Sequence, residues 1–326
     1  MTVEIGQSAV VSVATATLWA SPQEPDEITA PALRVPSGVR EWVAAMGRDL
    51  RVNGLGDKTL SQLLFNDEVI VDEIEGDWAK VVVPGQPAAK LGERGYPGWI
   101  PLAQLAAPPE ADGEDYIVDA TATALRDEPD GDVTVPGIIL STRLRKVGTP
   151  YRGWIPVAVP GQKDPAWVRG HDLSSADRTQ AVDGQAVLTV AARLLEVPYV
   201  WGGLSAYGVD CSGLVHLVYR YLGVTVPRDA DDQSDGSTAV DPADAAPGDL
   251  YFFAKDGRNI HHVGLVGVPD DNGDPTILHA SGVYGKVVHE TFTGDRRATL
   301  IGAGSVPLPT GVGAVGDGAE VGTTAG

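Results

Sequence analysis

A degenerate repeat in the first half of the chain is the feature that most constrains its fold. The segment Trp78–Gln86 (WAKVVVPGQ) matches Trp154–Gln162 (WIPVAVPGQ), with Trp, Val, Pro, Gly and Gln at equal offsets. Each copy is followed by a second tryptophan and an aliphatic residue, at Trp99 and Trp167. Short apolar runs that end in Pro-Gly turns are typical of small β-barrels.

The repeat therefore predicts two small β-barrels, over residues 1–108 and 114–175, with an acidic, proline-containing linker between them. The first barrel carries an insertion at 37–46 whose spacing predicts a short helix, with Ser37 as its possible N-cap. We expect Trp42 of this helix to pack against the barrel. The second barrel is short and offers few polar candidates, so we expect it to have a structural role.

The character of the chain changes after residue 175. Apolar residues at helical spacing predict helices at 185–195 and 212–222. Strand-like runs follow at 250–253, 262–268, 276–280, 286–292 and 299–303. Helices followed by an antiparallel sheet predict an α+β domain over 180–305. The tail at 309–326 is rich in Gly, Ala, Thr and Val, and we expect it to be disordered.

Charge and composition exclude several functions. The formal net charge of −20 disfavours nucleic acid and anionic lipid as partners, because both are polyanions. A single cysteine excludes an intramolecular disulfide. The first residues lack the basic start and apolar run of a secretory signal, and no stretch is long enough to span a membrane. We therefore expect a cytoplasmic protein, without a metal or other cofactor; the sequence gives no oligomeric state.

The single cysteine, Cys211, lies at the start of the second predicted helix. Amides at a helix N-terminus stabilise an anion, so this position is expected to lower the pKa of the thiol. A thiol nucleophile needs a base and a group that orients it. His262 and His279 lie in predicted strands after this helix and could supply both. The alternatives are a small buried cysteine and two ordinary strand histidines.

A series of motifs in the last part of the chain bears on this choice. In order they are Pro198-Tyr199-Val-Trp-Gly-Gly203, Asp210-Cys211-Ser212-Gly213-Leu214-Val215, Pro227-Arg228 with Gln233, Gly248-Asp249-Leu250 with Phe252-Phe253, His262-Val-Gly-Leu, and His279-Ala. Over residues 180–305 this series resembles the NlpC/p60 family of cell-wall peptidases. The resemblance implies a papain-like α+β fold.

The resemblance also implies a Cys-His-His triad, carried here by Cys211, His262 and His279. His261 is set aside because the period of a strand puts it on the opposite face from His262. Tyr199 matches a tyrosine whose hydroxyl helps the oxyanion hole in related enzymes; the alternative is a core tyrosine.

Two N-terminal barrels before such a domain resemble the bacterial SH3-like domains of the YkfC-like γ-D-glutamyl-L-diamino acid endopeptidases. Those enzymes cleave murein peptides that have a free N-terminal L-alanine. The resemblance implies that four residues bind the alanine amine: Asp210, Ser212, Tyr96 and Glu68, with Asp67 as a rival for the last. The acidic run at 229–235 is read as a solvated loop, with a cation-attracting rim of the cleft as the alternative.

The sequence thus predicts a cysteine endopeptidase that acts on murein peptides in peptidoglycan turnover or recycling. It leaves open whether the diamino acid is lysine or diaminopimelate. Two alternatives remain: a non-catalytic cell-wall-binding protein that uses its SH3-like barrels, and an acyltransferase or amidase of the same fold.

Overall fold

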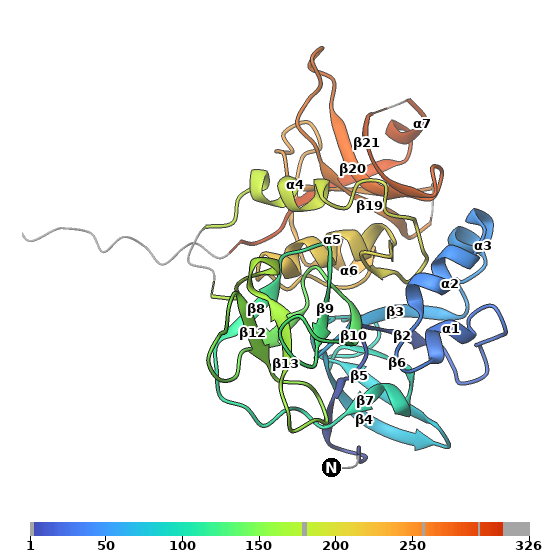
Figure 1. The fold of residues 1–326 in the computed structure, drawn as a ribbon. Coiled ribbons are helices and arrows are strands. Elements are labelled where there is room, and N and C mark those ends of the chain that lie inside the picture. The colour runs from blue at the N-terminus through green and yellow to red at the C-terminus, as the bar shows by residue number, and fades with distance from the viewer. Residues whose placement is uncertain (1–2, 178–180, 256–257, 293, 309–326) are drawn as a thin grey trace, which may run out of the picture.

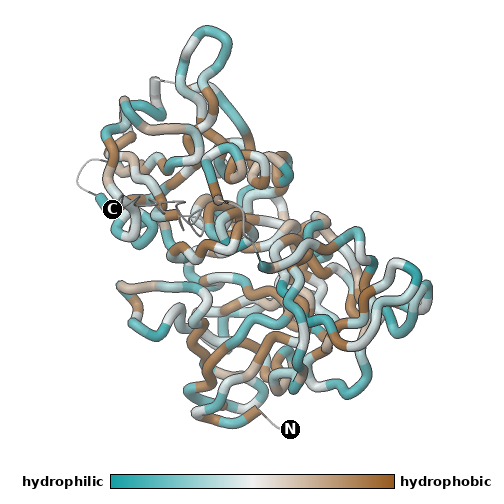
Figure 2. Tube along the Cα trace, turned by 90° about the vertical axis from the view of Figure 1, so that its left-hand side faces the viewer, coloured by the Kyte–Doolittle hydropathy of each residue, from teal (hydrophilic) through white to brown (hydrophobic). Residues whose placement is uncertain are grey.

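The computed structural model describes residues 3–177, 181–255, 258–292 and 294–308 (Figure 1). The prediction for the tail at 309–326 lies outside these residues. The fold combines helices with antiparallel sheets, so the predicted α+β class is confirmed. Hydrophilic stretches gather on the protruding loops, and most hydrophobic stretches run through the inside of the molecule (Figure 2).

A seven-stranded antiparallel sheet, in the order β3-β2-β6-β5-β4-β1-β7, forms the N-terminal part of the molecule. Its strands are β1 (Ser8–Val11), β2 (Thr15–Trp19), β3 (Thr59–Leu64), β4 (Glu68–Glu75), β5 (Trp78–Val83), β6 (Tyr96–Pro101) and β7 (Leu105–Ala106). Alternating apolar residues, such as Val69 and Val71 on β4, point into its core. A 3₁₀ turn at Leu102–Gln104 joins β6 to β7.

Three short helices are inserted between β2 and β3: α1 (Ala30–Leu33), α2 (Val39–Ala45) and α3 (Arg48–Asn53). Trp42 on α2 is fully buried against Trp19, with ring centroids 5.9 Å apart. The predicted N-cap is wrong. Gly38 occupies that position, and the Ser37 hydroxyl has no hydrogen-bond partner among the described residues.

The two copies of the repeat have the same strand register. In the first copy Lys80 lies opposite Trp99, and in the second Pro156 lies opposite Trp167. Each partner tryptophan thus faces the position two residues after the tryptophan that opens its copy. The glutamines differ, because Gln86 is buried and bonded to Ser61, whereas the equivalent residue of the second copy is exposed.

The second copy lies in a separate pair of small sheets, ordered β10-β9-β13-β12 and β11-β8-β14. The strands are β8 (Asp115–Val118), β9 (Ala122–Arg126), β10 (Val133–Ile139), β11 (Arg143–Arg145), β12 (Trp154–Val157), β13 (Ala166–Arg169) and β14 (Leu173–Ser175), with a 3₁₀ turn at Gly170–Asp172. One core of buried residues, including Leu125, Ile138 and Val168, holds both sheets together.

The C-terminal part contains a six-stranded antiparallel sheet, in the order β17-β22-β18-β19-β20-β21. Its strands are β17 (Thr238–Val240), β18 (Leu250–Ala254), β19 (Ile260–Val266), β20 (Thr276–Ser281), β21 (Lys286–Thr291) and β22 (Leu300–Ser305). The remaining elements are α4 (Gly184–Ala192), β15 (Leu204–Ser205), β16 (Gly208–Val209), α5 (Cys211–Tyr221), α6 (Ala230–Asp235) and α7 (Gly294–Arg297).

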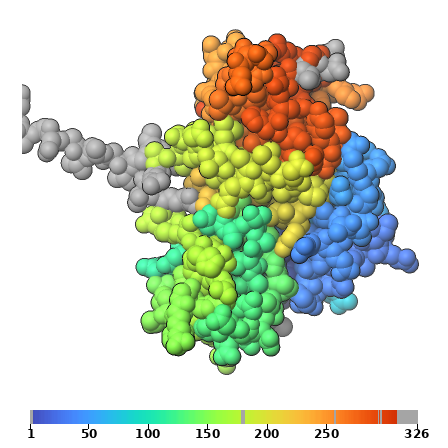
Figure 3. Space-filling view, turned by 45° about the horizontal axis from the view of Figure 1, so that its top comes forward, coloured from blue at the N-terminus to red at the C-terminus, as the bar shows by residue number. Residues whose placement is uncertain are grey.

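Helix α5 is the centre of the molecule, between the sheet of β17–β22 and the N-terminal sheet (Figure 1). Ten of its eleven residues are buried, because both of its sides are covered. The guanidinium of Arg220 on α5 forms a buried ion pair with Asp67 from the β3–β4 turn. Gln62 on β3 accepts a hydrogen bond from the amide of Leu204 at 3.0 Å. These contacts hold the N-terminal sheet against α5 and β15, and the N-terminal and C-terminal parts meet closely at the surface (Figure 3).

Candidate active site

Cys211 is the first residue of α5 and is 7% exposed. It lines a cavity of about 320 Å³. Residues from two segments of the chain, 56–96 and 199–261, line the cavity with it: Gly56, Thr59, Leu60, Tyr96, Tyr199, Trp201, Asp210, Ser212, Asp229, Ala230, Asp231, Asn259, Ile260 and His261. The N-terminal sheet and the C-terminal part therefore share one cavity around the thiol.

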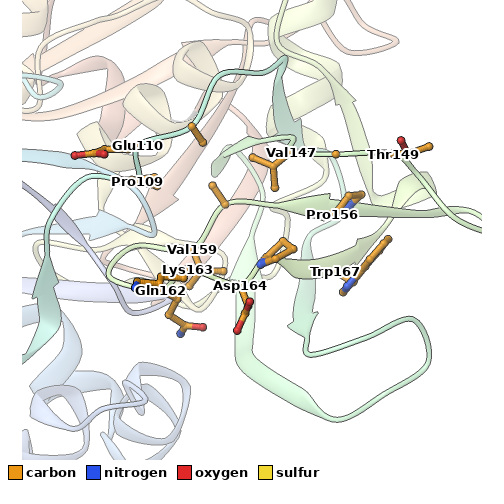
Figure 4. Close-up of a pocket in the computed structure, with 14 residues that line it drawn as sticks. Pro109, Glu110, Val147, Thr149, Pro156, Val159, Gln162, Lys163, Asp164 and Trp167 are labelled. Carbon is orange, nitrogen blue, oxygen red and sulfur yellow. The ribbon is translucent and has the colours of Figure 1, made fainter.

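A second hollow lies on the pair of small sheets formed by β8–β14, beside the linker (Figure 4). It measures about 400 Å³ and is lined by prolines, Trp167, Lys163 and Asp164, among others. It contains no thiol and no imidazole, so the chemistry of the molecule is to be sought around Cys211.

Two imidazoles lie next to each other on neighbouring strands beside α5. His262 on β19 and His279 on β20 are joined by a hydrogen bond of 2.7 Å between Nε2 of His262 and Nδ1 of His279. The amide of Val263, the residue after His262, donates to the Cys211 thiol, as does the amide of Ser212. Strand β19 thus contacts the thiol at the residue next to His262, and the His262 imidazole is hydrogen-bonded to that of His279.

His261 is exposed, whereas His262 is buried. The pairing of β18 with β19 is irregular next to it, between Phe253 and Ala254. His261 lies at the rim of the cavity and makes no hydrogen bond to His279, so only His262 joins the pair of imidazoles.

An acid that sequence reasoning missed extends this series. Glu290 on β21 accepts a hydrogen bond from Nε2 of His279 at 3.0 Å. His279 is paired with Val288, so Glu290, two residues further along β21, is the diagonal neighbour of His279 on the same face of the sheet. The only signal for Glu290 in the sequence was that an acidic residue lies on the strand that follows His279.

Tyr199 lines the cavity and its hydroxyl is hydrogen-bonded to the Cys211 thiol. Its backbone amide is fixed by the carbonyl of Gly285 at 2.8 Å. The side chain is therefore both a buried tyrosine and a hydrogen-bond donor next to the thiol. The two alternatives drawn from the sequence, a core tyrosine and a tyrosine of the oxyanion hole, are compatible with each other.

Asp210 is the N-cap of α5 and accepts a hydrogen bond from the Gly213 amide at 2.7 Å. Arg228, which is 1% exposed, donates to both oxygens of this carboxylate, at 3.0 and 2.8 Å. Arg228 also donates to the hydroxyls of Ser212 and Ser61, at 3.0 and 2.8 Å. The charge of Asp210 is thus already balanced within the protein.

Tyr96 is hydrogen-bonded to an acid that does not belong to the N-terminal sheet. The Tyr96 hydroxyl donates to Oδ2 of Asp229 at 3.0 Å, and both residues line the cavity of Cys211. Asp229 belongs to the acidic run that the sequence reading treated as a solvated loop. It is instead partly buried, at the start of α6.

Glu68 and its rival Asp67 do not lie in the cavity. Glu68 is exposed at the start of β4 and accepts a hydrogen bond from Ser8 at 2.7 Å. Asp67 is occupied by Arg220 and by the amide of Leu64. The prediction that either acid lines the site is corrected here, since the way the N-terminal sheet packs against α5 turns both away from Cys211.

The thiol is not acidified as its helix position predicted. Burial raises the pKa of Cys211 to about 12, and the carboxylate of Asp210 adds to the rise. That carboxylate already accepts the hydrogen bond of the Gly213 amide at the helix N-terminus, so this amide does not stabilise a thiolate. Burial, followed by the proximity of His279, also lowers the pKa of His262 well below its usual value. At neutral pH the free site therefore holds a neutral thiol and a neutral imidazole.

This protonation state can be tested by alkylation, because only the thiolate reacts readily. For the free folded protein, we expect the rate of Cys211 labelling by iodoacetamide to keep rising with pH through 10, by about tenfold per unit. The unfolded chain in denaturant serves as the control, since its thiol should titrate near the ordinary value of about 8.5. A plateau below pH 8 in the folded protein would contradict the raised pKa.

Within the described ranges, no three His, Cys, Asp or Glu side chains are grouped as a metal site would require. No helix among the residues with described structure is long and apolar enough to cross a membrane.

Comparison with known proteins agrees with this geometry. Residues 196–299 match the model of the NlpC/P60 family. The chain is 33% identical over 282 residues to the γ-D-glutamyl-L-lysine dipeptidyl-peptidase of Bacillus cereus, covering 83% of this chain and 82% of that one. It is 31% identical to the protein of the same name from Bacillus subtilis, covering 77% and 84%.

The crystal structure of an NlpC/P60 family protein from Bacillus cereus superposes with a TM-score of 0.83 at 29% identity, covering 92% of this chain and 99% of that one. A buried thiol at a helix start, next to paired imidazoles on an antiparallel sheet, is the arrangement of a cysteine peptidase. The chain belongs to the NlpC/P60 family of cysteine peptidases, as the resemblance predicted. This membership, with Cys211, His262 and His279 all present, argues against the non-catalytic alternative.

Proposed function

We propose that this peptidase hydrolyses the γ-D-glutamyl-L-diamino acid bond of murein peptides that have a free N-terminal L-alanine, in peptidoglycan turnover or recycling. The observation that carries the proposal is that Tyr96 and Asp229 line the same cavity as Cys211. The names of the two Bacillus relatives, which specify a γ-D-glutamyl-L-lysine bond, support it.

The alanine ammonium would be held by Asp229 with Tyr96. Arg228 donates to both oxygens of Asp210 but lies 4.0 Å from Oδ1 of Asp229. The third carboxylate of the cavity, Asp231, is paired with Lys90 at 2.8 Å, so Asp229 has the longest cation contact of the three. Burial raises the pKa of Asp229, which means that its charge is poorly solvated in the free protein. An ammonium would relieve this cost, and an uncharged N-acetyl group would not. Ser212 and Asp210 would shape the wall beside it.

Bond cleavage would start with the neutral pair of thiol and imidazole. His262 would take the proton of Cys211 as the sulfur attacks the γ-carbonyl of the glutamate. The amide at the start of α5 and the Tyr199 hydroxyl would stabilise the oxyanion. His262 would then give its proton to the amine of the diamino acid as the C–N bond breaks. The product of this step is a thioester between Cys211 and L-alanyl-γ-D-glutamate.

Water would complete the cycle. The vacated side of the cavity would admit a water molecule, which His262 deprotonates as the oxygen attacks the thioester carbonyl. The thiolate would leave and recover its proton from His262. His279 would hold the ring of His262 throughout, through the hydrogen bond of 2.7 Å.

The test compares L-Ala-γ-D-Glu-L-diamino acid peptides with a free and an acetylated N-terminus, with both lysine and diaminopimelate as the diamino acid. We expect the free peptide to be cleaved with a kcat/KM about 10- to 100-fold higher, because one charge-assisted contact is worth roughly 1.5–3 kcal/mol. Asp229→Asn should remove most of this preference. Asp235→Asn, which removes an exposed acid of the same helix that pairs with Lys90, should retain it.

Equal cleavage of the free and acetylated peptides by the unaltered protein would refute recognition of the amine. Cleavage of neither peptide, with turnover of another amide or acyl donor, would favour the acyltransferase or amidase alternative.

A further inference from the structure

The hydrogen bonds behind the thiol do not end at the second imidazole. His279 is fully buried between His262 and the carboxylate of Glu290, whose side chain is 16% exposed. Both nitrogens of the His279 ring are engaged, Nδ1 by His262 at 2.7 Å and Nε2 by Glu290 at 3.0 Å. Three side chains from three adjacent strands, β19, β20 and β21, therefore form one continuous chain of contacts.

The carboxylate determines where the protons lie in this chain. The hydrogen bond from His279 lowers the pKa of Glu290 to about 2, so near neutral pH the carboxylate is ionised and can only accept. Nε2 of His279 must then carry the proton. Burial lowers the pKa of His279, so its ring is neutral and Nδ1 is an acceptor. Nε2 of His262 must therefore donate, which leaves the lone pair of His262 on Nδ1.

We propose that Glu290 is a positioning residue that fixes the tautomers of both imidazoles and thereby makes Nδ1 of His262 the base for Cys211. The inference rests on the proposed roles of Cys211, His262 and His279, and it adds Glu290 as a fourth member of that series. Glu290 does not line the substrate cavity, so it would act only through His279.

Arg296 on α7 contacts the carboxylate of Glu290. Its Nε and Nη2 atoms both lie 3.1 Å from Oε1 of Glu290. The hydroxyl of Tyr284, from the turn between β20 and β21, also bonds Glu290. Arg296 keeps the carboxylate ionised and opposes a second proton on His279. A doubly protonated His279 would donate from Nδ1, and it would turn the lone pair of His262 away from the thiol.

The charged and titratable groups around the series are thus His262 from β19, His279 from β20, Tyr284 from the following turn, Glu290 from β21 and Arg296 from α7. His261 acts on His262 at longer range, and Lys255 acts on His261. Burial is the main reason that the neutral rings are favoured, and the cations add to it, whereas Glu290 favours a second proton on His279.

The test combines kinetics with ¹⁵N NMR of the histidine rings. In Glu290→Gln the uncharged amide can accept or donate, so the tautomer of His279 is no longer imposed. We expect kcat to fall by about 10- to 100-fold with little change in KM, since a lost orienting partner acts on the chemical step. The ¹⁵N signals of His262 and His279 should change from single tautomers to mixtures. Glu196→Gln, which removes an exposed acid bonded to Lys286 of the same strand, should change neither.

A second variant covers the case in which Glu290→Gln fails to fold. Arg296→Gln should raise the pKa of His279 and move the acidic limb of the kcat profile to higher pH. Unchanged kcat and unchanged ring signals in Glu290→Gln, or an unshifted profile in Arg296→Gln, would overturn the proposal. The NMR readout needs no substrate, so it separates this inference from the proposed function. Altered tautomers without cleavage of murein peptides would refute only the latter.

Discussion

Cys211→Ala is expected to lose the peptidase activity by at least about a thousandfold, because no other described residue can form the thioester. The measurement is kcat/KM on the free tripeptide, with the folded state checked by thermal unfolding. The chain has one cysteine, so loss of labelling by iodoacetamide reports on the same sulfur without ambiguity.

Two controls distinguish the loss of the nucleophile from a loss of stability. Cys211 is buried against α5 and β19, and removing its sulfur should cost only about 1 kcal/mol of stability. Cys211→Ser keeps the shape of the side chain and should be nearly as inactive, because a hydroxyl is far less readily deprotonated. Activity within tenfold of the original protein in the folded alanine variant would remove Cys211 from the mechanism.

The second large effect concerns stability. Arg228→Met is expected to lower the free energy of unfolding by about 3–5 kcal/mol, because it leaves the carboxylate of Asp210 buried without its cation. Arg228 is 1% exposed, and it makes two charged hydrogen bonds to Asp210 and two more to the hydroxyls of Ser61 and Ser212. Urea unfolding monitored by tryptophan fluorescence measures the change.

A matched pair at the surface provides the comparison. Arg94 also makes two hydrogen bonds to one carboxylate, at 2.9 and 2.6 Å from Asp72, but it is exposed. Arg94→Met should leave the unfolding curve almost unchanged, since water replaces the lost contacts. Adding Asp210→Asn to Arg228→Met should recover part of the loss, because asparagine still caps the helix and carries no charge. An unfolding midpoint in Arg228→Met equal to that of the original protein would contradict the argument.

Residues embedded in local motifs could be predicted from the sequence. Cys211, His262 and His279 were named from short segments whose neighbours specify a helix start and two strands, and the structure brings the three regions together. Their catalytic roles stay predictions until the variants are measured. Glu290 was missed because no motif surrounds it, and its contact depends on the diagonal register of two strands.

Other errors have a tertiary origin. Glu68 was chosen without knowing how the N-terminal sheet meets α5, and the Asp67–Arg220 ion pair fixes that contact in a way that turns both acids outward. Asp229 was read as solvated because local acidity does not reveal the tyrosine that comes from residue 96. The thiol pKa was misjudged because helix position ignores burial and the capping carboxylate.

Part of the cavity wall comes from a different segment of the chain than the reactive groups. The thiol and both imidazoles come from residues after 210, whereas Tyr96 and the wall at 56–60 come from the N-terminal sheet. Substitutions in the early part of the chain can therefore alter which peptides are accepted while the bond-breaking groups stay as they are. Natural or laboratory exchange of that sheet between relatives is a direct route to enzymes with new preferences.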